Sequence, residues 1–438
     1  MRARRTLRQE ASATHVEQDQ PRGTTFSEVM RDALLPYAAS RLVLVAVGLV
    51  ANFYLLPMTV NSGLRAPFPQ VFWLMWQRFD SDFYLNIAQS GYGQPAFGEA
   101  GGVDWVFLPL YPLLMAGLGS ILGGSGTAFV LAGVLISNTA GLAAATYLYL
   151  LVRDEWSREV AQRVVLYLAF FPMSFYLSAV YTEALFLALA VACLYHARRQ
   201  SWWIAALCGG LAAASRPQGI VLIVPLAWEY SRVLSARYAP PPAQLDGPWR
   251  VRASIRVRCY VRGLILASRE LRNWFTAASL ALVPAGLVSF MLYGFAQTGD
   301  LLIFFRVSDE TWGRALSFPW HALSDAVRHP MLGDPMNYSF WLLNLPLAII
   351  FLACVILSFR YLPAVYAIYT AVMVVLPLSA TVLMSLGRLY LVVFPAFVLL
   401  ALWSRASDSR RHALILASLA TSQALFMAFF VVGMPAIV

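Results

Sequence analysis

The run YAASRLVLVAVGLVANFYLLP, residues 37–57, decides the fold. A helix needs about 20 apolar residues to cross a bilayer, and about ten further runs of this kind follow along the chain. The 438-residue sequence is 60% hydrophobic and only 12% charged, whereas a soluble domain carries roughly 25% charged residues. We therefore predict an all-α polytopic membrane protein, with a cytoplasmic tail over residues 1–36 and a single transmembrane domain over residues 37–438.

The net charge of +10 comes from arginine alone, because the sequence contains no lysine. These arginines collect in loops beside apolar runs, which is the pattern that orients a membrane protein with its basic loops in the cytoplasm. The charge therefore argues against a nucleic-acid partner.

The N-terminal residues lack an apolar core segment, which predicts no cleaved signal peptide. The four cysteines have no CxxC spacing and no set of histidines that would complete a metal site, so we interpret them as structural or incidental.

The loops fix the predicted topology. Residues 232–273 carry nine arginines and only two acids, which predicts a basic cytoplasmic loop. A first outer loop is expected over residues 58–127, with interfacial helices, and a second outer loop over residues 298–336. The N-terminus is then cytoplasmic. The predicted spans are 37–57, 128–151, 164–180, 183–197, 201–215, 218–234, 274–297, 337–358, 362–384, 388–404 and 411–433.

Residues 106–122 are assigned to the outer interface rather than to a span. The segment is short and interrupted by proline and glycine, and counting it as a span would place Arg198 and Arg199 outside. The spans 183–197 and 201–215 would each rise only ~22 Å. The polar turns at their outer ends should therefore lie below the membrane surface, in a cavity open to the outside.

The first outer loop contains the best candidate for a catalytic group. Residues 71–90 follow a helical apolar pattern and predict one amphipathic helix in the interface, with Asp80 turned toward the protein and Asp82 toward water. A partly buried carboxylate is the better general base, which favours Asp80. The alternatives are a solvated helix face or a divalent-cation site formed by Asp80 and Asp82.

Three further charged residues are expected at the outer ends of spans. Glu183 either contributes to function or forms a structural ion pair with Arg216. Arg216 and Arg388 violate the positive-inside pattern and therefore need partners, and a phosphate suits the planar guanidinium well.

The second outer loop carries Trp312, Arg314, Trp320 and His321, which could close over a substrate. Aromatic rings suit the apolar faces of sugars, but an interfacial aromatic belt is an equal alternative. His321 and His329 alone make no metal site. No Walker loop and no Ser-His-Asp arrangement is present in the sequence, so nucleotide-dependent chemistry has no support.

The chain resembles the PIG-V-like branch of the GT-C glycosyltransferases. The resemblance rests on blocks of sequence that occur in order between residues 76 and 395: Arg78-Phe79-Asp80, Tyr84-Leu85-x-Ile87-Ala88-x-x-Gly91-Tyr92, Phe107-Leu108-Pro109-Leu110-Tyr111-Pro112, Phe171-Pro172, Ser178-Ala179-x-Tyr181-Thr182-Glu183-Ala184-Leu185-Phe186, Ser215-Arg216-Pro217-x-Gly219 and Gly387-Arg388. The chain departs from the usual pattern at Phe79, where tryptophan is commoner.

The resemblance implies a GT-C-type bundle of about 11 transmembrane helices that transfers a sugar, with mannose favoured, from a polyprenyl-phosphate donor to a lipid or lipid-linked glycan acceptor. Asp80 corresponds to the presumed catalytic base, and Arg388 and Arg216 are expected to bind the donor phosphate. Asp82, Tyr84, Tyr181, Glu183, Trp312 and Arg314 are expected to line the substrate cavity.

The expected setting is a bacterial plasma membrane with the site on its outer face. No cofactor is expected, with a divalent cation as the open alternative. The competing function is a transporter or flippase of a lipid-linked sugar, which would predict inverted repeats and polar groups near the bilayer midplane.

Overall fold

The computed structural model describes residues 24–94, 102–242, 248–328, 343–381, 385–405 and 409–434. These ranges are almost entirely helical, and their only β-type pairing is an isolated bridge between Leu316 and Ala380. The predicted all-α class is confirmed. The call on residues 1–36 as a tail lies mostly outside the described residues.

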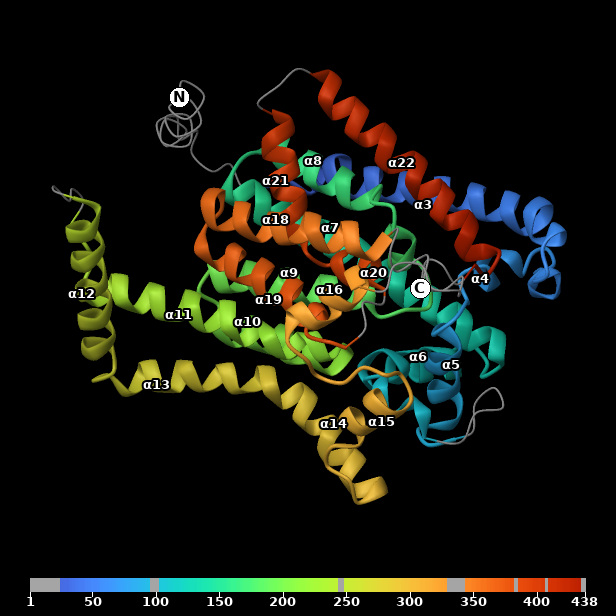
Figure 1. Cartoon of the computed structure of the whole chain (residues 1–438), viewed down its shortest axis with the longest axis horizontal. Helices are drawn as coiled ribbons and strands as arrows, with labels where there is room; N and C mark the ends of the chain where they lie inside the picture. Colours follow the sequence, from blue (N-terminus) through green and yellow to red (C-terminus); the bar gives the residue numbers. More distant parts are fainter. Residues whose placement is uncertain are drawn as a thin grey trace.

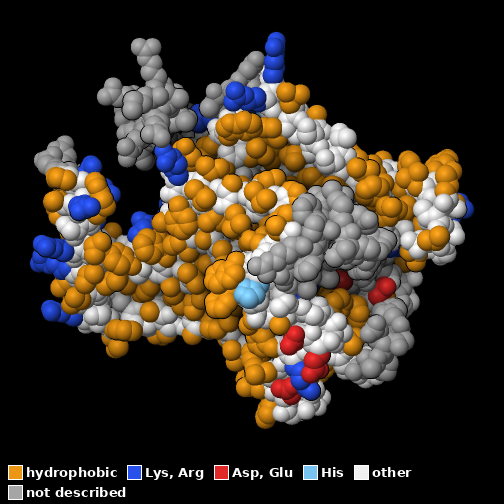
Figure 2. Space-filling model, in the orientation of Figure 1, with side chains coloured by type: hydrophobic (Ala, Val, Ile, Leu, Met, Phe, Trp, Pro, Cys, Tyr) orange, Lys and Arg blue, Asp and Glu red, His pale blue; other side chains and the backbone are white. Residues whose placement is uncertain are grey.

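Five helical stretches are long and apolar enough to cross a membrane, which confirms an integral membrane protein. They are Phe26–Met58, Gly126–Glu155, Pro217–Tyr238, Leu271–Thr298 and Ser409–Val431. Five shorter apolar helices accompany them, so the total of about eleven spans stays a prediction. Apolar side chains cover most of the visible described surface in Figure 2, as a lipid-facing protein requires.

The helices before the second outer loop are arranged as follows. The N-terminal half contains α2 (Phe26–Val29), α3 (Leu35–Val50), α4 (Val71–Leu74), α5 (Ser81–Ser90), α6 (Leu110–Ile121), α7 (Gly126–Glu155), α8 (Arg158–Ala169), α9 (Glu183–Arg198) and α10 (Trp202–Ser215). They are followed by α11 (Ile223–Tyr238), α12 (Trp249–Ala267), α13 (Leu271–Ala278) and α14 (Leu282–Thr298).

The C-terminal part closes the bundle. It contains α15 (Ile303–Glu310), α16 (Pro319–Arg328), α18 (Leu345–Tyr361), α19 (Ala364–Leu378), α20 (Leu386–Tyr390), α21 (Phe394–Arg405) and α22 (Ser409–Val431). Helix α7 packs against α6, α8 and α9, and α22 packs along α3. Figure 1 shows α3 and α22 side by side, so the two ends of the transmembrane domain meet.

The predicted span 164–180 is wrong. Helix α8 begins earlier, at Arg158, and ends at Ala169, after which residues 170–182 form turns that are mostly fully buried. Pro172 has no backbone N–H to continue the helix, which explains the break. Buried backbone needs hydrogen-bond partners, and Arg41 supplies two of them by donating to the carbonyls of Ala169 and Ser174, both at 2.6 Å.

Helices α10 and α14 approach closely through two glycines, Gly210 and Gly286. A Cβ at Gly286 would collide with the carbonyl oxygen of Gly210. Small residues at such crossings allow backbones to come together in a membrane, where apolar burial gives little drive for association.

We expect Gly286→Ala to lower the free energy of unfolding by about 1–3 kcal/mol, because the added methyl overpacks this contact. Gly117→Ala is the matched control, since no heavy atom lies within 4 Å of a Cβ there. Thermal unfolding of the two variants in the same detergent checks the prediction. Equal midpoints for both would show that the crossing tolerates a wider separation.

Candidate active site

Asp80 lies at a sharp turn rather than inside a continuous helix. The predicted single helix over residues 71–90 is wrong, because α4 and α5 are separate and Phe79 between them has a left-handed φ of 53°. Asp80 immediately precedes α5, where an aspartate commonly accepts a hydrogen bond from the first-turn backbone. Its side chain makes no such bond. The carboxylate is instead turned toward Arg388.

Arg78 holds this turn in place through backbone contacts. Its guanidinium is buried and donates to four carbonyl oxygens: Gln77 at 2.7 Å, Val431 at 3.0 Å, Leu74 at 3.1 Å and Leu64 at 3.3 Å. The Arg78-Phe79-Asp80 block therefore combines two roles. Arg78 ties the turn to the C-terminal end of α22, and Asp80 faces Arg388. This role of Arg78 was not anticipated from the sequence.

Tyr181 connects the turn to the buried segment before α9. Its hydroxyl donates to the carbonyl of Arg78 at 3.0 Å and accepts from the N–H of Asp80 at 3.1 Å. Close by, the N–H of Val180 donates to the carbonyl of Trp76 at 3.2 Å. Helix α7 supports this segment from the other side, because Ser137 donates to the carbonyl of Ala179 at 2.7 Å.

Arg388 reaches the site from a distant part of the chain. It lies on the short helix α20, whose first residue Leu386 donates its N–H to the side-chain oxygen of Asn344 at 3.0 Å. A Cβ at Gly387 would lie 2.9 Å from the methyl carbon of Met173, so the glycine lets α20 pack against the 170–182 segment. This contact gives the Gly387-Arg388 block a steric explanation.

The structure brings four predicted residues into one ionic network. Nη1 of Arg388 lies 2.6 Å from Oδ2 of Asp80, and Nε of Arg388 lies 3.3 Å from Oε1 of Glu183. Oε1 of Glu183 also pairs with Arg216. The structural ion pair proposed for Glu183 and Arg216 is therefore present. The Arg388 side chain is only 7% exposed and that of Glu183 only 1%.

Aromatic rings pack against one side of this network. The guanidinium carbon of Arg388 lies 5.2 Å from the ring centroid of Tyr181 and 5.7 Å from that of Tyr176. Such cation–π contacts stabilise a buried guanidinium. Tyr84 lies behind them, with its hydroxyl 3.4 Å from Thr182 and its ring 6.2 Å from that of Tyr181. Tyr176 was not selected as a site residue from the sequence. It lies eight residues before Ala184, and nothing in that position indicated a role in the site.

The second outer loop folds over the same region. Trp312 packs its ring against Phe83, at 5.7 Å between centroids, and against Phe107, at 6.0 Å. The residues that follow pair with the end of α19, since the N–H of Thr381 donates to the carbonyl of Ala315 at 3.1 Å. Arg314 lies between Trp312 and Ala315, and the contacts of these two residues fix the backbone on both sides of it.

Arg314 is the third arginine of the site. Its charge interacts with those of Arg388, Asp80 and Arg216, and no ion pair of the described residues includes it. Burial, followed by repulsion from Arg388, lowers the pKa of Arg314 to about 10. With Arg216, Arg314 and Arg388 against Asp80 and Glu183, the five side chains carry one excess positive charge.

Three buried polar atoms in or beside the network lack a hydrogen-bond partner within the described ranges: Oε2 of Glu183, Nε of Arg388 and Nε1 of Trp312. Leaving a buried donor or acceptor unpaired is unfavourable, and such atoms commonly bond to a ligand or water instead. The site thus has one free acceptor, on Glu183, and two free donors, on Arg388 and Trp312.

Asp82 does not face water as predicted. It is partly buried and accepts a hydrogen bond from Nε2 of Gln77 at 2.7 Å, and burial raises its pKa. The part of the chain that the structure describes contains no group of three or more His, Cys, Asp or Glu side chains that could hold a metal ion. His321 lies exposed on α16, and His329 lies outside the described residues.

The comparisons with known proteins agree with the resemblance seen in the sequence. Residues 54–233 match the sequence model of a family described as mannosyltransferase (PIG-V). No curated protein matches the chain. The matched segment contains Asp80, Glu183 and Arg216, and the fold adds Arg314 and Arg388 from beyond it.

Several solved structures are similar at low identity. The apo oligosaccharyltransferase of Archaeoglobus fulgidus is 11% identical, with a TM-score of 0.45, over 92% of this chain and 56% of that chain. ArnT from Cupriavidus metallidurans bound to undecaprenyl phosphate is 14% identical, with a TM-score of 0.47, over 90% of this chain and 76% of that chain. This chain thus spans little more than half the length of the archaeal enzyme.

The fold and the acid–arginine network define a multispanning membrane protein with a polar site built where four separated segments meet. Residues 54–233 resemble the PIG-V mannosyltransferase family, which confirms the resemblance predicted from the sequence.

Proposed function

We propose that the protein is an inverting glycosyltransferase that moves a sugar, with mannose favoured by the family match, from a polyprenyl-phosphate donor to a hydroxyl of a lipid or lipid-linked glycan. The observation that carries the proposal is the placement of the Asp80 carboxylate beside Arg388, Arg216 and Arg314 in one partly closed site.

Asp80 is the proposed general base. It would take the proton from the acceptor hydroxyl as that oxygen attacks the anomeric carbon, and the bond between this carbon and the phosphate oxygen would break on the opposite face. Positioned proton transfer of this kind contributes typically 10²–10⁴-fold to a rate. In the present structure Arg388 contacts Oδ2 of Asp80, and it is this contact that aims the carboxylate away from the α5 backbone.

The arginines are the proposed binding site for the leaving phosphate. A lipid monophosphate carries more negative charge when it leaves than when it is esterified to the sugar, so fixed positive charges stabilise the transition state more than the bound donor. The excess positive charge of the network suits this role. Arg314 forms no ion pair among the described residues, so it is the arginine most available to bind the phosphate.

An apolar groove next to α5 supports a lipid-linked substrate. It has a volume of about 310 Å³ and lies between α5, α6 and α14, lined by Ile87, Tyr92, Leu113, Phe290 and Tyr293 among others. Helix α5 is roughly 15 Å long at 1.5 Å per residue, and Asp80 lies just before its first residue and Tyr92 just beyond its end. A lipid chain in this groove would leave its head group near the ionic network.

We propose the outer face of the membrane for the site and the cytoplasm for the N-terminus. Helix α12, whose sequence is rich in arginine, lies at one end of the molecule, and α5 lies toward the other (Figure 1). Basic segments favour the cytoplasmic side, which leaves the end with Asp80 outside. The divalent-cation alternative at Asp80 and Asp82 receives no support from their geometry, because Arg388 and Gln77 already occupy one oxygen of each carboxylate.

The test is a transfer assay with the purified full chain in liposomes that contain a membrane lipid extract. The donor is polyprenyl-phosphate mannose labelled in the sugar. The proposal expects labelled mannose in a new lipid and an equal amount of free polyprenyl phosphate. Movement of the intact donor across the bilayer without cleavage would overturn the proposal and favour a flippase.

We expect Arg314→Gln to raise the KM for the donor by about 10–100-fold, because charged hydrogen bonds contribute about 1.5–3 kcal/mol. Stability should change little, since no ion pair in the described ranges is broken. The matched control is Arg306→Gln on the same outer loop. Arg306 pairs with Asp300 at 2.8 Å on an exposed surface, and its removal should change the KM less than about threefold. Equal effects of the two variants would contradict the assignment of Arg314.

A further inference from the structure

Helix α12 occupies an unusual position at the end of the molecule farthest from α5. It begins at Trp249, ends at Ala267 and crosses the ends of α11 and α13 rather than running along them (Figure 1). Since α11 and α13–α14 belong to stretches long enough to span a membrane, a helix that crosses their ends lies along the membrane surface.

One face of α12 is firmly attached to α11. A Cβ at Gly263 would lie 2.5 Å from the carbonyl oxygen of Ser235, so the two backbones are in close contact there. Tyr260 adds a hydrogen bond to Ser231 at 2.7 Å, and its ring stacks on that of Trp228 at 6.0 Å. The helix is thus held in a fixed orientation.

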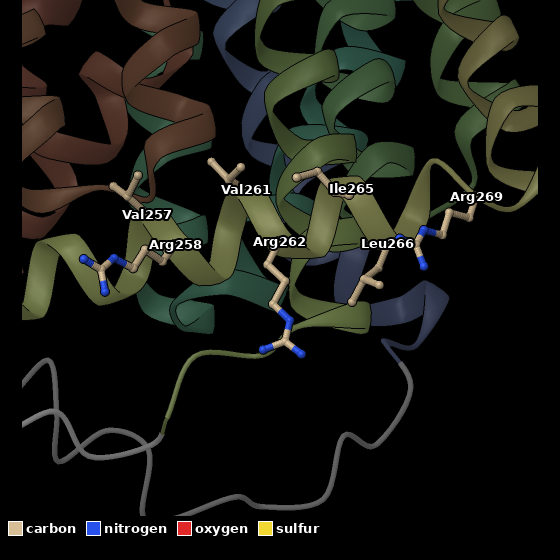
Figure 3. Close-up of a pocket in the computed structure, with 7 residues that line it drawn as sticks. All are labelled: Val257, Arg258, Val261, Arg262, Ile265, Leu266 and Arg269. Carbon is tan, nitrogen blue, oxygen red and sulfur yellow. The ribbon is translucent and has the colours of Figure 1, made fainter.

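The other face of α12 combines an apolar stripe with arginines. Val257, Val261 and Ile265 recur every four residues and are 61%, 48% and 55% exposed. Together with Arg258, Arg262 and Arg269 these residues line an open groove of about 480 Å³. Figure 3 shows the three aliphatic side chains pointing to one side of the helix and Arg262 to the other.

The arginines of this helix lack acidic partners in the described part of the chain. The ion pairs found there include none of Arg250, Arg252, Arg256, Arg258 and Arg262. Figure 2 shows this end of the molecule as a cluster of basic side chains. An uncompensated positive surface attracts an anionic partner and repels a second copy of itself, which argues against self-association through this face.

We propose that α12 binds anionic phospholipid head groups, with Val257, Val261 and Ile265 inserted at the boundary of the acyl chains and Arg258 and Arg262 on the phosphates. An apolar stripe beside arginines is the pattern of a helix that lies in the membrane interface. Anionic lipid surfaces attract basic segments by about fivefold in affinity for each arginine. The inference is independent of the reaction at Asp80.

The test is hydrogen exchange of the backbone amides of residues 249–267 in the full chain, held in nanodiscs of phosphatidylcholine with increasing amounts of phosphatidylglycerol. We expect exchange to slow as phosphatidylglycerol is added at low salt, and to recover at high salt because the attraction is screened. Exchange that is the same at every lipid composition would overturn the proposal.

A double variant isolates the arginines. Arg258→Gln with Arg262→Gln should weaken the response to phosphatidylglycerol roughly 25-fold, while the packing face at Tyr260 and Gly263 stays intact. The matched control is Arg360→Gln with Arg411→Gln, which removes the same charge from the ends of α18 and α22 and should leave the response of α12 unchanged. An equal loss in both pairs would show that only net charge matters and would overturn the assignment to α12.

Discussion

Asp80→Asn should reduce sugar transfer by about 10²–10⁴-fold while the protein is made and folded normally. Asparagine keeps the size of the side chain and can still bond to Arg388 through its carbonyl oxygen, but it cannot accept a proton. The backbone N–H of residue 80 keeps its bond to Tyr181. Initial rates of labelled-mannose transfer at saturating donor, with protein amounts matched by immunoblot, measure the effect.

Asp82→Asn is the matched control for this prediction. Asp82 lies two residues away and is also partly buried, but its oxygen bonds to Gln77 rather than to the network. A neutral amide can replace it in that bond, so transfer should fall less than about fivefold. If Asp82→Asn lost as much activity as Asp80→Asn, or if neither lost activity, Asp80 would not be the base.

Arg388→Ala should cause the largest combined loss of stability and activity. It removes the buried cation between Asp80 and Glu183 and leaves Asp80 without its ionic partner. Breaking a buried ion pair from one side costs about 3–5 kcal/mol. Transfer should fall at least as far as in Asp80→Asn, because the leaving phosphate would lose one of the three arginines proposed to bind it. Thermal unfolding in detergent and the transfer assay measure the two losses separately.

The double variant Arg388→Ala with Asp80→Asn separates folding from function. Removing the stranded charge at position 80 should restore part of the stability lost in Arg388→Ala, and the coupling between the two sites should be positive. Activity should stay absent. Arg388→Lys keeps one charge but cannot reach Asp80 and Glu183 at once, so it should retain more stability than activity. Full activity in Arg388→Lys would show that the guanidinium shape is unimportant.

The membrane character of the chain followed from the sequence because it depends on the summed apolar content of each run. Residues 37–57 and 411–433 correspond to long apolar helices in the structure. The same approach failed at residues 71–90 and 164–180, where apolar spacing predicted continuous helices. There the break comes from specific backbone states, the left-handed Phe79 and the proline at 172, which a periodic pattern does not register.

The candidate residues were visible in the sequence as charges that an apolar chain retains only with a partner. Glu183, Arg216 and Arg388 could be selected one at a time on this ground. Asp80 was selected as a partly buried acid of the first outer loop, and Arg314 only as part of the second outer loop that could close over a substrate. The ion pair between Glu183 and Arg216 was one of the alternatives that the sequence offered, and the structure contains it. The partners of Asp80 and Arg388 could not be predicted. Arg388 was expected to bind a phosphate, yet in the structure it forms ion pairs with Asp80 and Glu183.

The sequence by itself thus determined the class of the protein, its longest apolar helices and the identity of the unusual charged residues, because these depend on local composition. Only the tertiary structure decided which charges meet. Asp80 and Arg388 are separated by more than 300 residues. Their contact requires the Arg78 anchor, the turns and short 3-10 helix of residues 170–182 and the close packing of Gly387 on Met173 to form together. No local pattern encodes a contact that depends on so many distant ones.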